Sequence, residues 1–278
     1  MSVVAAIQMT STSDLKSNLS VVERLLQKAY EVGAKLVVLP EMFPFQSPES
    51  LEKITLAEEL GSGKIQSFLS EQAKKHQLWI VGGTIPIRTQ SPDKVYAASL
   101  VFNSQGQLVT HYNKIHLFDV TVDEKEHYLE SATVEPGNTL CLVDTPVGKL
   151  GLAVCYDIRF PEMFRCLFNQ GAELFAIPAA FTAPTAHAHI AVYLPAPAID
   201  NLAYIITACQ TGEHEHFRRT YGHSMIVSPW GSILQQLPEG EGIVVSHIDL
   251  ALLKKIRKDI PIKDHQKLVL KEWKVTVM

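Results

Sequence analysis

The chain has 278 residues, a formal net charge of −4, 46% hydrophobic residues and 19% charged residues. This length fits one large α/β domain or two small ones, and the composition favours a sizeable core over disorder. The acidic balance and the lack of a Lys/Arg run give no electrostatic footprint for nucleic acid or for an anionic membrane surface.

The cysteines and the N-terminus indicate the cellular compartment. The N-terminus turns polar without the basic start of a secretory signal, and no apolar stretch reaches the length of a membrane span. The cysteines form no CxxC pair, so we expect reduced thiols in a cytoplasmic protein rather than a disulfide framework or a zinc site. They are Cys141, Cys155, Cys166 and Cys209.

The pattern of apolar residues predicts a β-α-β opening. Residues 3–7 are typical of a buried strand, residues 14–32 have apolar side chains at helical spacing before Gly33, and residues 35–39 form a second strand before Pro40. Further helices are expected at 61–77, 161–170 and 250–257. Further strands are expected at 78–85, 96–103, 107–112, 150–154, 174–177, 204–208, 223–227, 232–237 and 243–248.

We expect one domain over residues 1–278, because no repeat or long linker divides the chain. Helices and strands alternate early, whereas hairpins are predicted later around Ser104-Gln-Gly106 and Pro229-Trp-Gly231. This mixture favours an α/β fold of two packed sheets with helices outside.

Three chemically reactive residues follow predicted strands. Glu41 comes after 35–39, Lys114 after 107–112 and Cys155 after 150–154. A sharp strand-to-helix turn presents a nucleophile beside free backbone N–H groups, which can hold an oxyanion. Taken singly, each residue also fits a plain structural role: a buried thiol, a solvated acid or an exposed cation.

The combination resembles the nitrilase superfamily, the carbon–nitrogen hydrolases. Three segments carry the resemblance, and they occur in the family's order and spacing. They are Lys35-Leu-Val-Val-Leu-Pro-Glu-Met42, Tyr112-Asn-Lys-Ile-His-Leu-Phe-Asp119 and Gly151-Leu-Ala-Val-Cys-Tyr-Asp-Ile-Arg-Phe-Pro-Glu162. The resemblance covers about residues 3–265 and implies an α-β-β-α sandwich that forms a homodimer or a higher homo-oligomer.

The resemblance also implies roles for individual residues. Cys155 would be the nucleophile, Glu41 the general base and Lys114 the cation that stabilises the oxyanion with the Tyr156 backbone N–H. Glu130, in Tyr128-Leu-Glu-Ser131 ahead of Pro136-Gly137, would be a second glutamate of the site. No metal or organic cofactor is expected. The product would be ammonia, released from a small carboxylate-bearing amide through a thioester.

Other segments indicate the branch of the family. Residues 210–225, and Phe181 after Ile177-Pro178, resemble the small Nit-type amidases, more the deaminated glutathione type than the ω-amidases. Arg159 and Arg218/Arg219 could meet a substrate carboxylate or form structural ion pairs. An ω-amidase, an N-carbamoyl-amino-acid hydrolase, a nitrilase and a catalytically silent scaffold remain alternatives.

One region departs from the family pattern. Ala186 stands where a glycine is usual, Ile190 and Ala191 replace Trp-Glu, and Pro195 and Pro197 replace two arginines. Because proline disrupts a helix, a kinked, shortened or delayed helix is expected here. His187/His189 and His214/His216, at i, i+2, are expected on one side of a strand. We interpret them as loop or pocket-rim residues rather than metal ligands.

Overall fold

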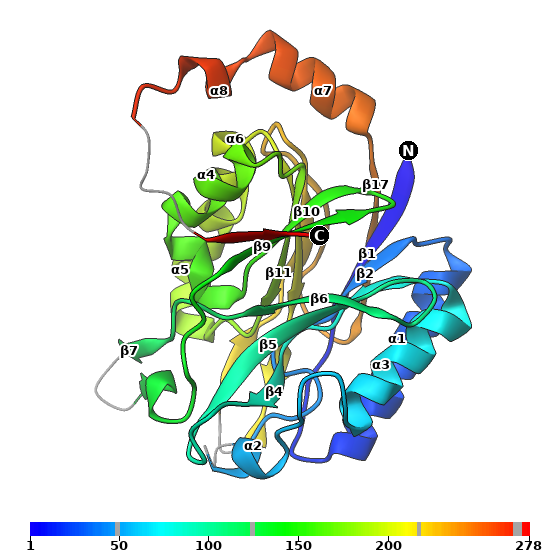
Figure 1. Cartoon of the computed structure of the whole chain (residues 1–278), viewed down its shortest axis with the longest axis vertical. Helices are drawn as coiled ribbons and strands as arrows, with labels where there is room; N and C mark the ends of the chain where they lie inside the picture. The colour runs from blue at the N-terminus through cyan, green and yellow to red at the C-terminus, as the bar shows by residue number, and fades with distance from the viewer. Residues whose placement is uncertain (48–50, 123–125, 216–217, 269–273) are drawn as a thin grey trace.

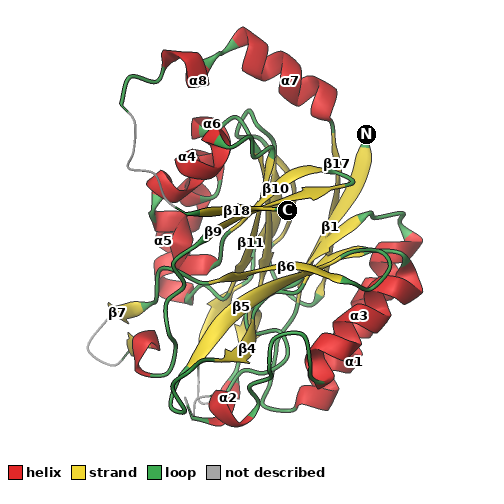
Figure 2. Cartoon of the chain, in the orientation of Figure 1, coloured by secondary structure: helices red, strands yellow, loops and turns green. Residues whose placement is uncertain are grey.

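Two seven-stranded sheets pack face to face and carry helices on their outer sides (Figures 1 and 2). The computed structural model describes residues 1–47, 51–122, 126–215, 218–268 and 274–278. This arrangement confirms the predicted α-β-β-α sandwich.

In the first sheet, strand β1 lies between β2, with which it pairs in parallel, and the edge strand β17, with which it pairs antiparallel over its whole length. The strand order is β17-β1-β2-β3-β5-β4, with β6 paired to β5. The bounds are β1 Ser2–Gln8, β2 Leu36–Val38, β3 Trp79–Val81, β4 Ile85–Arg88, β5 Val95–Phe102, β6 Leu108–Asn113 and β17 Gly242–Ile248.

Strand β1 is buried on both faces, and its side chains alternate between two cores. Ala5 and Ile7 pack with helices α1 (Leu15–Glu31) and α3 (Lys64–His76), whereas Val4 and Ala6 face the second sheet. This continuous apolar strand is what a sheet covered on both sides requires. Asp14 caps α1 by accepting a hydrogen bond from the Lys16 N–H.

The second sheet has the order β16-β15-β12-β11-β10-β9-β18. Its outer side carries α4 (Pro161–Asn169), α5 (Ala183–Tyr193) and α6 (Pro195–Asp200), and Phe164 of α4 packs edge-on against Phe175 of β11. The bounds are β9 Leu140–Thr145, β10 Gly148–Leu152, β11 Leu174–Ala179, β12 Tyr204–Cys209, β15 Ser224–Val227, β16 Ile233–Leu237 and β18 Val275–Val277.

Short elements surround the ends of the sheets. The sequence did not predict the short helices α2 and α8, or the small hairpins β7–β8 and β13–β14; the helix predicted at 250–257 is present as α7. Their bounds are α2 Glu52–Thr55, β7 Asp119–Thr121, β8 His127–Leu129, β13 Thr211–Glu213, β14 Arg219–Tyr221, α7 Leu250–Asp259 and α8 Ile262–His265. Two 3₁₀ turns, η1 (Glu130–Ala132) and η2 (Cys155–Arg159), carry candidate site residues. Among the described helices, none combines the length and apolar character that a membrane span requires.

The strand expected at 78–85 is instead two strands, β3 and β4, with Gly82-Gly83-Thr84 between them. Gly83 has φ +50°, and a Cβ there would lie 2.0 Å from the Pro40 carbonyl oxygen. Only glycine permits this approach, which turns the chain out of the sheet beside the loop that carries Glu41.

The helix expected near Ala186–Pro197 is interrupted rather than delayed. Helix α5 ends at Tyr193 and α6 begins at Pro195, with Leu194 between them. Proline is tolerated at the first position of a helix, because the N–H that it lacks would have no partner within the helix there. The second segment therefore starts at Pro195. The expected disruption is therefore confirmed.

Candidate functional site

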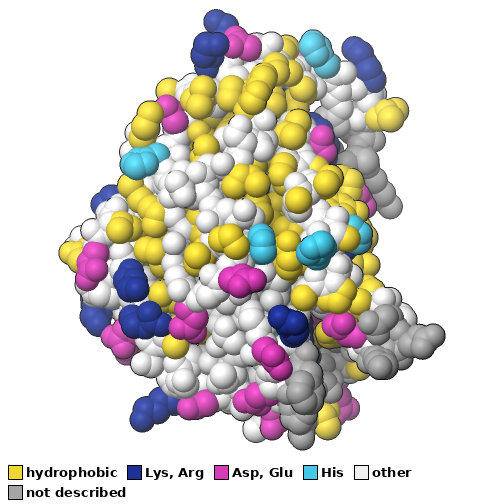
Figure 3. All heavy atoms as spheres, turned by 180° about the vertical axis from the view of Figure 1, so that it is seen from behind, with side chains coloured by type: hydrophobic (Ala, Val, Ile, Leu, Met, Phe, Trp, Pro, Cys, Tyr) yellow, Lys and Arg dark blue, Asp and Glu magenta, His cyan; other side chains and the backbone are white. Residues whose placement is uncertain are grey.

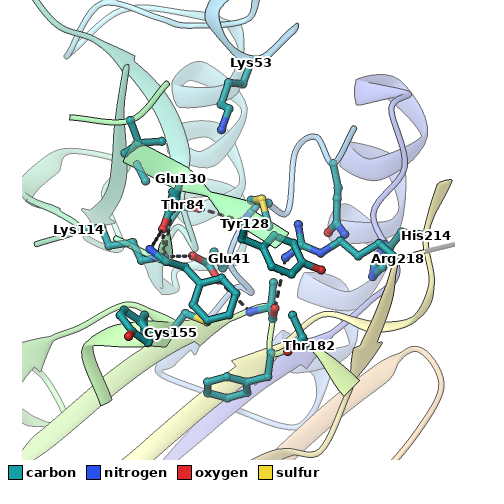
Figure 4. Close-up of a pocket in the computed structure, with 18 of the residues that line it drawn as sticks. Glu41, Lys53, Thr84, Lys114, Tyr128, Glu130, Cys155, Thr182, His214 and Arg218 are labelled. Atoms are coloured by element: carbon teal, nitrogen blue, oxygen red, sulfur yellow. Dashed lines mark hydrogen bonds and ion pairs between the residues drawn. The ribbon is translucent and has the colours of Figure 1, made fainter. Parts of the chain in front are cut away.

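A cavity of about 960 Å³ opens at the ends of the central strands and contains all four predicted catalytic residues. Glu41, Lys114, Glu130 and Cys155 gather at one end of it (Figure 4). Glu41 follows β2 and Lys114 follows β6 of the first sheet, whereas Cys155 follows β10 of the second. The site therefore lies at the junction of the two sheets.

Lys114 is the centre of a buried charge cluster. Its Nζ lies 2.8 Å from Glu41 Oε1, 2.8 Å from Glu130 Oε2 and 3.1 Å from Glu130 Oε1. Burial opposes the charged form of Lys114, but the carboxylates of Glu130 and Glu41 raise its pKa well above the usual value. The ammonium therefore stays protonated and neutralises part of the acidic charge.

Backbone groups hold both carboxylates in place. The Ala180 N–H, at the end of β11, donates to Glu41 Oε2 at 2.9 Å, and the Phe118 N–H donates to Glu130 Oε2 at 2.6 Å. The Met42 N–H donates to Thr84 Oγ1 at 2.9 Å, which ties the turn after Glu41 to the glycine-rich bend. These bonds restrict Glu41 to one orientation toward the nucleophile.

Cys155 begins η2 with φ +45°, a left-handed conformation that is rare for a residue other than glycine. Its side chain is buried, and burial followed by the nearby Glu41 carboxylate raises the pKa of its thiol well above the usual value, although Lys114 opposes this. At neutral pH the resting nucleophile is therefore a thiol, and attack requires a base. Backbone strain of this kind is typical of functional turns.

Asp157, which was not predicted from the sequence, holds the turn that carries Cys155 through several hydrogen bonds. It is fully buried and accepts hydrogen bonds from the Val154 N–H at 2.8 Å, the Tyr112 hydroxyl at 2.8 Å and the His116 N–H at 3.1 Å. His116 Nδ1 lies 2.7 Å from Asp157 Oδ1. An acidic residue in the first turn of a helix is favoured by the partial positive charge of the helix N-terminus, and this preference could have pointed to Asp157.

The three residues predicted to bind substrate or oxyanion all line the cavity. Tyr156 lies in η2, whose first N–H groups have no partner within the turn. Phe181 follows β11 and is buried. Arg159 makes no ion pair within the described chain: its Nη2 lies 3.1 Å from His189 Nδ1, and its guanidinium stacks 4.9 Å from the Tyr193 ring centre.

The expectation that paired histidines share one side of a strand is wrong for His187 and His189, because both lie in helix α5. His214 is buried in a loop, with Nε2 2.7 Å from Thr220 Oγ1 and Nδ1 2.9 Å from the Ser11 carbonyl, and His216 lies outside the described residues. Among the residues whose placement is described, no group of three or more His, Cys, Asp and Glu side chains could hold a metal ion.

Sequence reasoning also missed Lys53 and Tyr128, which line the same cavity. Burial and a hydrogen bond to Glu126 raise the pKa of Tyr128 to about 12, so its hydroxyl stays neutral. Lys53 lies in the four-residue helix α2, which is too short to leave a periodic signal. The alternation of helices and strands along the sequence does not indicate that residues 52–55 lie beside the cavity.

Comparison with known proteins identifies this constellation. The family model for carbon-nitrogen hydrolases matches residues 3–258. The chain belongs to the carbon–nitrogen hydrolase family. This membership makes it a hydrolase of carbon–nitrogen bonds.

Similar proteins come from distant organisms. The chain is 40% identical over 269 residues to a Yersinia enterocolitica protein named deaminated glutathione amidase, covering 96% of this amidase and 93% of the relative. It is 39% identical to the human protein of the same name, over 95% of this chain and 82% of the relative.

Solved structures agree with the sequence relatives. The fold matches the C. elegans NitFhit protein with a TM-score of 0.89 and 35% identity, over 96% of this chain but only 65% of that longer protein. It also matches Saccharomyces cerevisiae Nit3, a member of branch 10 of the nitrilase superfamily, with a TM-score of 0.84 and 31% identity over 94% of each chain.

Proposed function

We propose that this amidase cleaves the C–N bond of a small carboxylate-bearing amide through a thioester on Cys155. The observation that carries the proposal is the Glu41–Lys114–Glu130 cluster at the same end of the cavity as a buried thiol of raised pKa. Such a thiol needs an adjacent base, and the adjacent cation matches the negative charge that develops during attack.

In the first half of the reaction, Glu41 takes the thiol proton as Cys155 Sγ attacks the carbonyl carbon. The negative charge on the carbonyl oxygen is met by Lys114 and by the Tyr156 N–H at the start of η2. One such donor typically lowers the barrier by about 3–4 kcal/mol. The tetrahedral intermediate then collapses, the C–N bond breaks, and Glu41 passes its proton to the leaving nitrogen.

In the second half, Glu41 takes a proton from water, whose oxygen attacks the thioester carbon. The C–S bond breaks, the carboxylic product leaves and the proton returns to the Cys155 sulfur. Glu130 holds Lys114 through two contacts and keeps its ammonium charged throughout. One carboxylate thus acts as base and acid in turn, while the other positions the cation.

The size of the cavity favours a peptide-like substrate. A volume of about 960 Å³ lies at the upper end of the usual range for small-molecule sites, far more than a five-carbon 2-oxo acid amide fills. Together with the relatives' names, this favours deaminated glutathione over ω-amidase substrates. The leaving group from this tripeptide-like amide is a peptidyl amine, whereas a primary amide releases ammonia.

The test measures both products from purified protein with deaminated glutathione, 2-oxoglutaramate, an N-carbamoyl amino acid and a simple nitrile. We expect turnover of deaminated glutathione with release of an amine, and no turnover by Cys155→Ala. Cys166→Ala, which removes a thiol of helix α4, serves as the matched control and keeps its activity. Full activity of Cys155→Ala would refute the mechanism, and preference for another compound would refute the assigned substrate.

We also propose that the amidase works as a cytoplasmic homo-oligomer. Four large apolar side chains of α5, α6 and the β15–β16 hairpin are 45–69% exposed: Val192, Ile199, Trp230 and Ile233. Figure 3 shows apolar side chains spread over the upper and central part of the face opposite to Figure 1. All four cysteines are described and free, as expected in a reducing compartment. A monomer in sedimentation experiments at micromolar concentration would contradict this proposal.

A further inference from the structure

We propose that Lys53 and Arg218 form a carboxylate-binding subsite in the cavity, apart from the catalytic cluster. The subsite would make a carboxylate remote from the scissile amide the main determinant of substrate choice. This inference rests on the proposed function and deepens it, since it names the residues that would bind the carboxylate of the amide substrate. It rests on the charges, contacts and burial of a few side chains.

Among the described residues, Lys53 is a cation without a counter-ion. Its side chain projects from α2 into the cavity toward the catalytic cluster (Figure 4), and it forms no hydrogen bond or ion pair with any other residue that the structure describes. Burial lowers its pKa, Glu130 opposes this, and Lys114 and Arg218 lower it further. An unpaired ammonium in this position is disfavoured unless an anion binds beside it.

Arg218 is the second poorly paired cation of the cavity. Its Nη2 donates to the Ala180 carbonyl at 3.5 Å, and its Nε is buried with no partner within the described chain. The guanidinium lies 5.2 Å from the Tyr128 ring centre (Figure 4), a contact that uses none of its N–H donors. Several N–H groups therefore remain for a ligand, and guanidinium geometry suits a carboxylate.

The charges of the cavity give the substrate an orientation. Glu41 and Glu130 bring two negative charges to one end, and Lys114 neutralises one of them. The carboxylate of a substrate would be repelled at that end. Lys53 and Arg218 add two positive charges, and Arg218 disfavours the charged form of Lys53 unless an anion binds beside them. A substrate carboxylate thus binds away from Cys155 and leaves the amide carbonyl at the nucleophile.

The other described acidic groups at the cavity have contacts of their own. Glu126 accepts a hydrogen bond from the Tyr128 hydroxyl, and Glu215 accepts one from the Ser13 hydroxyl at 2.7 Å. Gln46 is only 3% exposed and lines the cavity, yet neither its Oε1 nor its Nε2 has a partner among the described residues. A buried amide without partners is unusual and marks the same region as built for a polar ligand.

The first experiment uses two probes of equal size, iodoacetylglycine and iodoacetylglycinamide, which alkylate Cys155 and differ only in a remote carboxylate. The measured quantity is the alkylation rate with the carboxylate probe divided by the rate with the amide probe. We expect this ratio to be roughly 10-fold or more higher for wild type than for free glutathione. Lys53→Met and Arg218→Gln should each bring this ratio toward that of glutathione. Lys16→Met removes a positive charge on the exposed side of α1 and should leave the ratio unchanged.

The second experiment compares kcat/KM for deaminated glutathione and for its glycine carboxamide. Lys53→Met should lower kcat/KM for the carboxylate form by roughly 10- to 100-fold and change the carboxamide by less than about threefold. Equal effects of the variants on both members of each pair, in folded protein, would overturn the subsite. Absence of turnover with a retained alkylation preference would refute only the proposed function, because alkylation does not depend on the amide.

Discussion

Asp157→Asn tests whether the buried carboxylate below the nucleophile holds the turn together. Asp157 accepts bonds from two backbone N–H groups, those of Val154 and His116, one on each carboxylate oxygen. The Tyr112 hydroxyl and the His116 ring can exchange donor and acceptor roles to suit an amide. The backbone groups cannot, so either orientation of the introduced side-chain amide leaves one buried N–H unsatisfied.

The expected loss of stability follows from these contacts. One unsatisfied buried N–H costs about 1–3 kcal/mol, and the remaining bonds weaken because the acceptor is no longer charged. We therefore expect the free energy of unfolding to fall by about 2–4 kcal/mol. Val154 directly precedes Cys155, so alkylation of Cys155 by iodoacetamide should also slow by about tenfold, since a small displacement of a reacting group has effects of this order or larger.

Urea unfolding of wild type, Asp157→Asn and Asp144→Asn measures this difference. Asp144 is exposed, with a 3.6 Å contact to Lys149, so its variant should change stability by less than about 0.5 kcal/mol. An Asp157→Asn protein as stable as the control would refute the argument that this carboxylate organises the nucleophile turn.

Two further predictions concern the charges around Cys155. Because burial and Glu41 raise the pKa of the thiol, its alkylation rate should rise about tenfold per pH unit from pH 7 to 9, past the usual thiol pKa of about 8.5. A plateau below pH 8, measured by mass spectrometry, would contradict a neutral resting thiol. Lys114→Met should lower kcat by roughly 10²–10³-fold. A kcat within tenfold of wild type would show that the ammonium is not needed.

The longest elements were predictable from local pattern because their periodicity and end signals agree. Residues 14–32 gave α1 within one residue at each end, helped by Asp14 and Gly33. The hairpin around Ser104-Gln-Gly106 is confirmed by the pairing of β5 with β6. The strand expected at 78–85 was wrong as one element, because the contact of Gly83 with Pro40 is made across 43 positions and leaves no local trace.

The site shows the same division. Family segments led to Glu41, Lys114, Cys155 and Glu130, and the structure brings these four together, although their roles stay predictions. The groups that orient these four residues, and the additional cation of the cavity, were not predictable from the sequence. The Ala180 N–H is a backbone group without a residue signature, and Lys53 reaches the cavity only because α2 folds over it. Such contacts come from tertiary packing rather than from spacing.

The pairing of β1 with β17 bears on how the chain reaches its native state. Ser2 lies opposite Ile248, so β1 is synthesised long before β17, the strand that covers its antiparallel edge. Contacts of such sequence separation slow folding and expose an unpaired apolar edge meanwhile. A nascent chain that stalls before residue 242 would present that edge to other chains, which makes β1 the segment where aggregation during synthesis should begin.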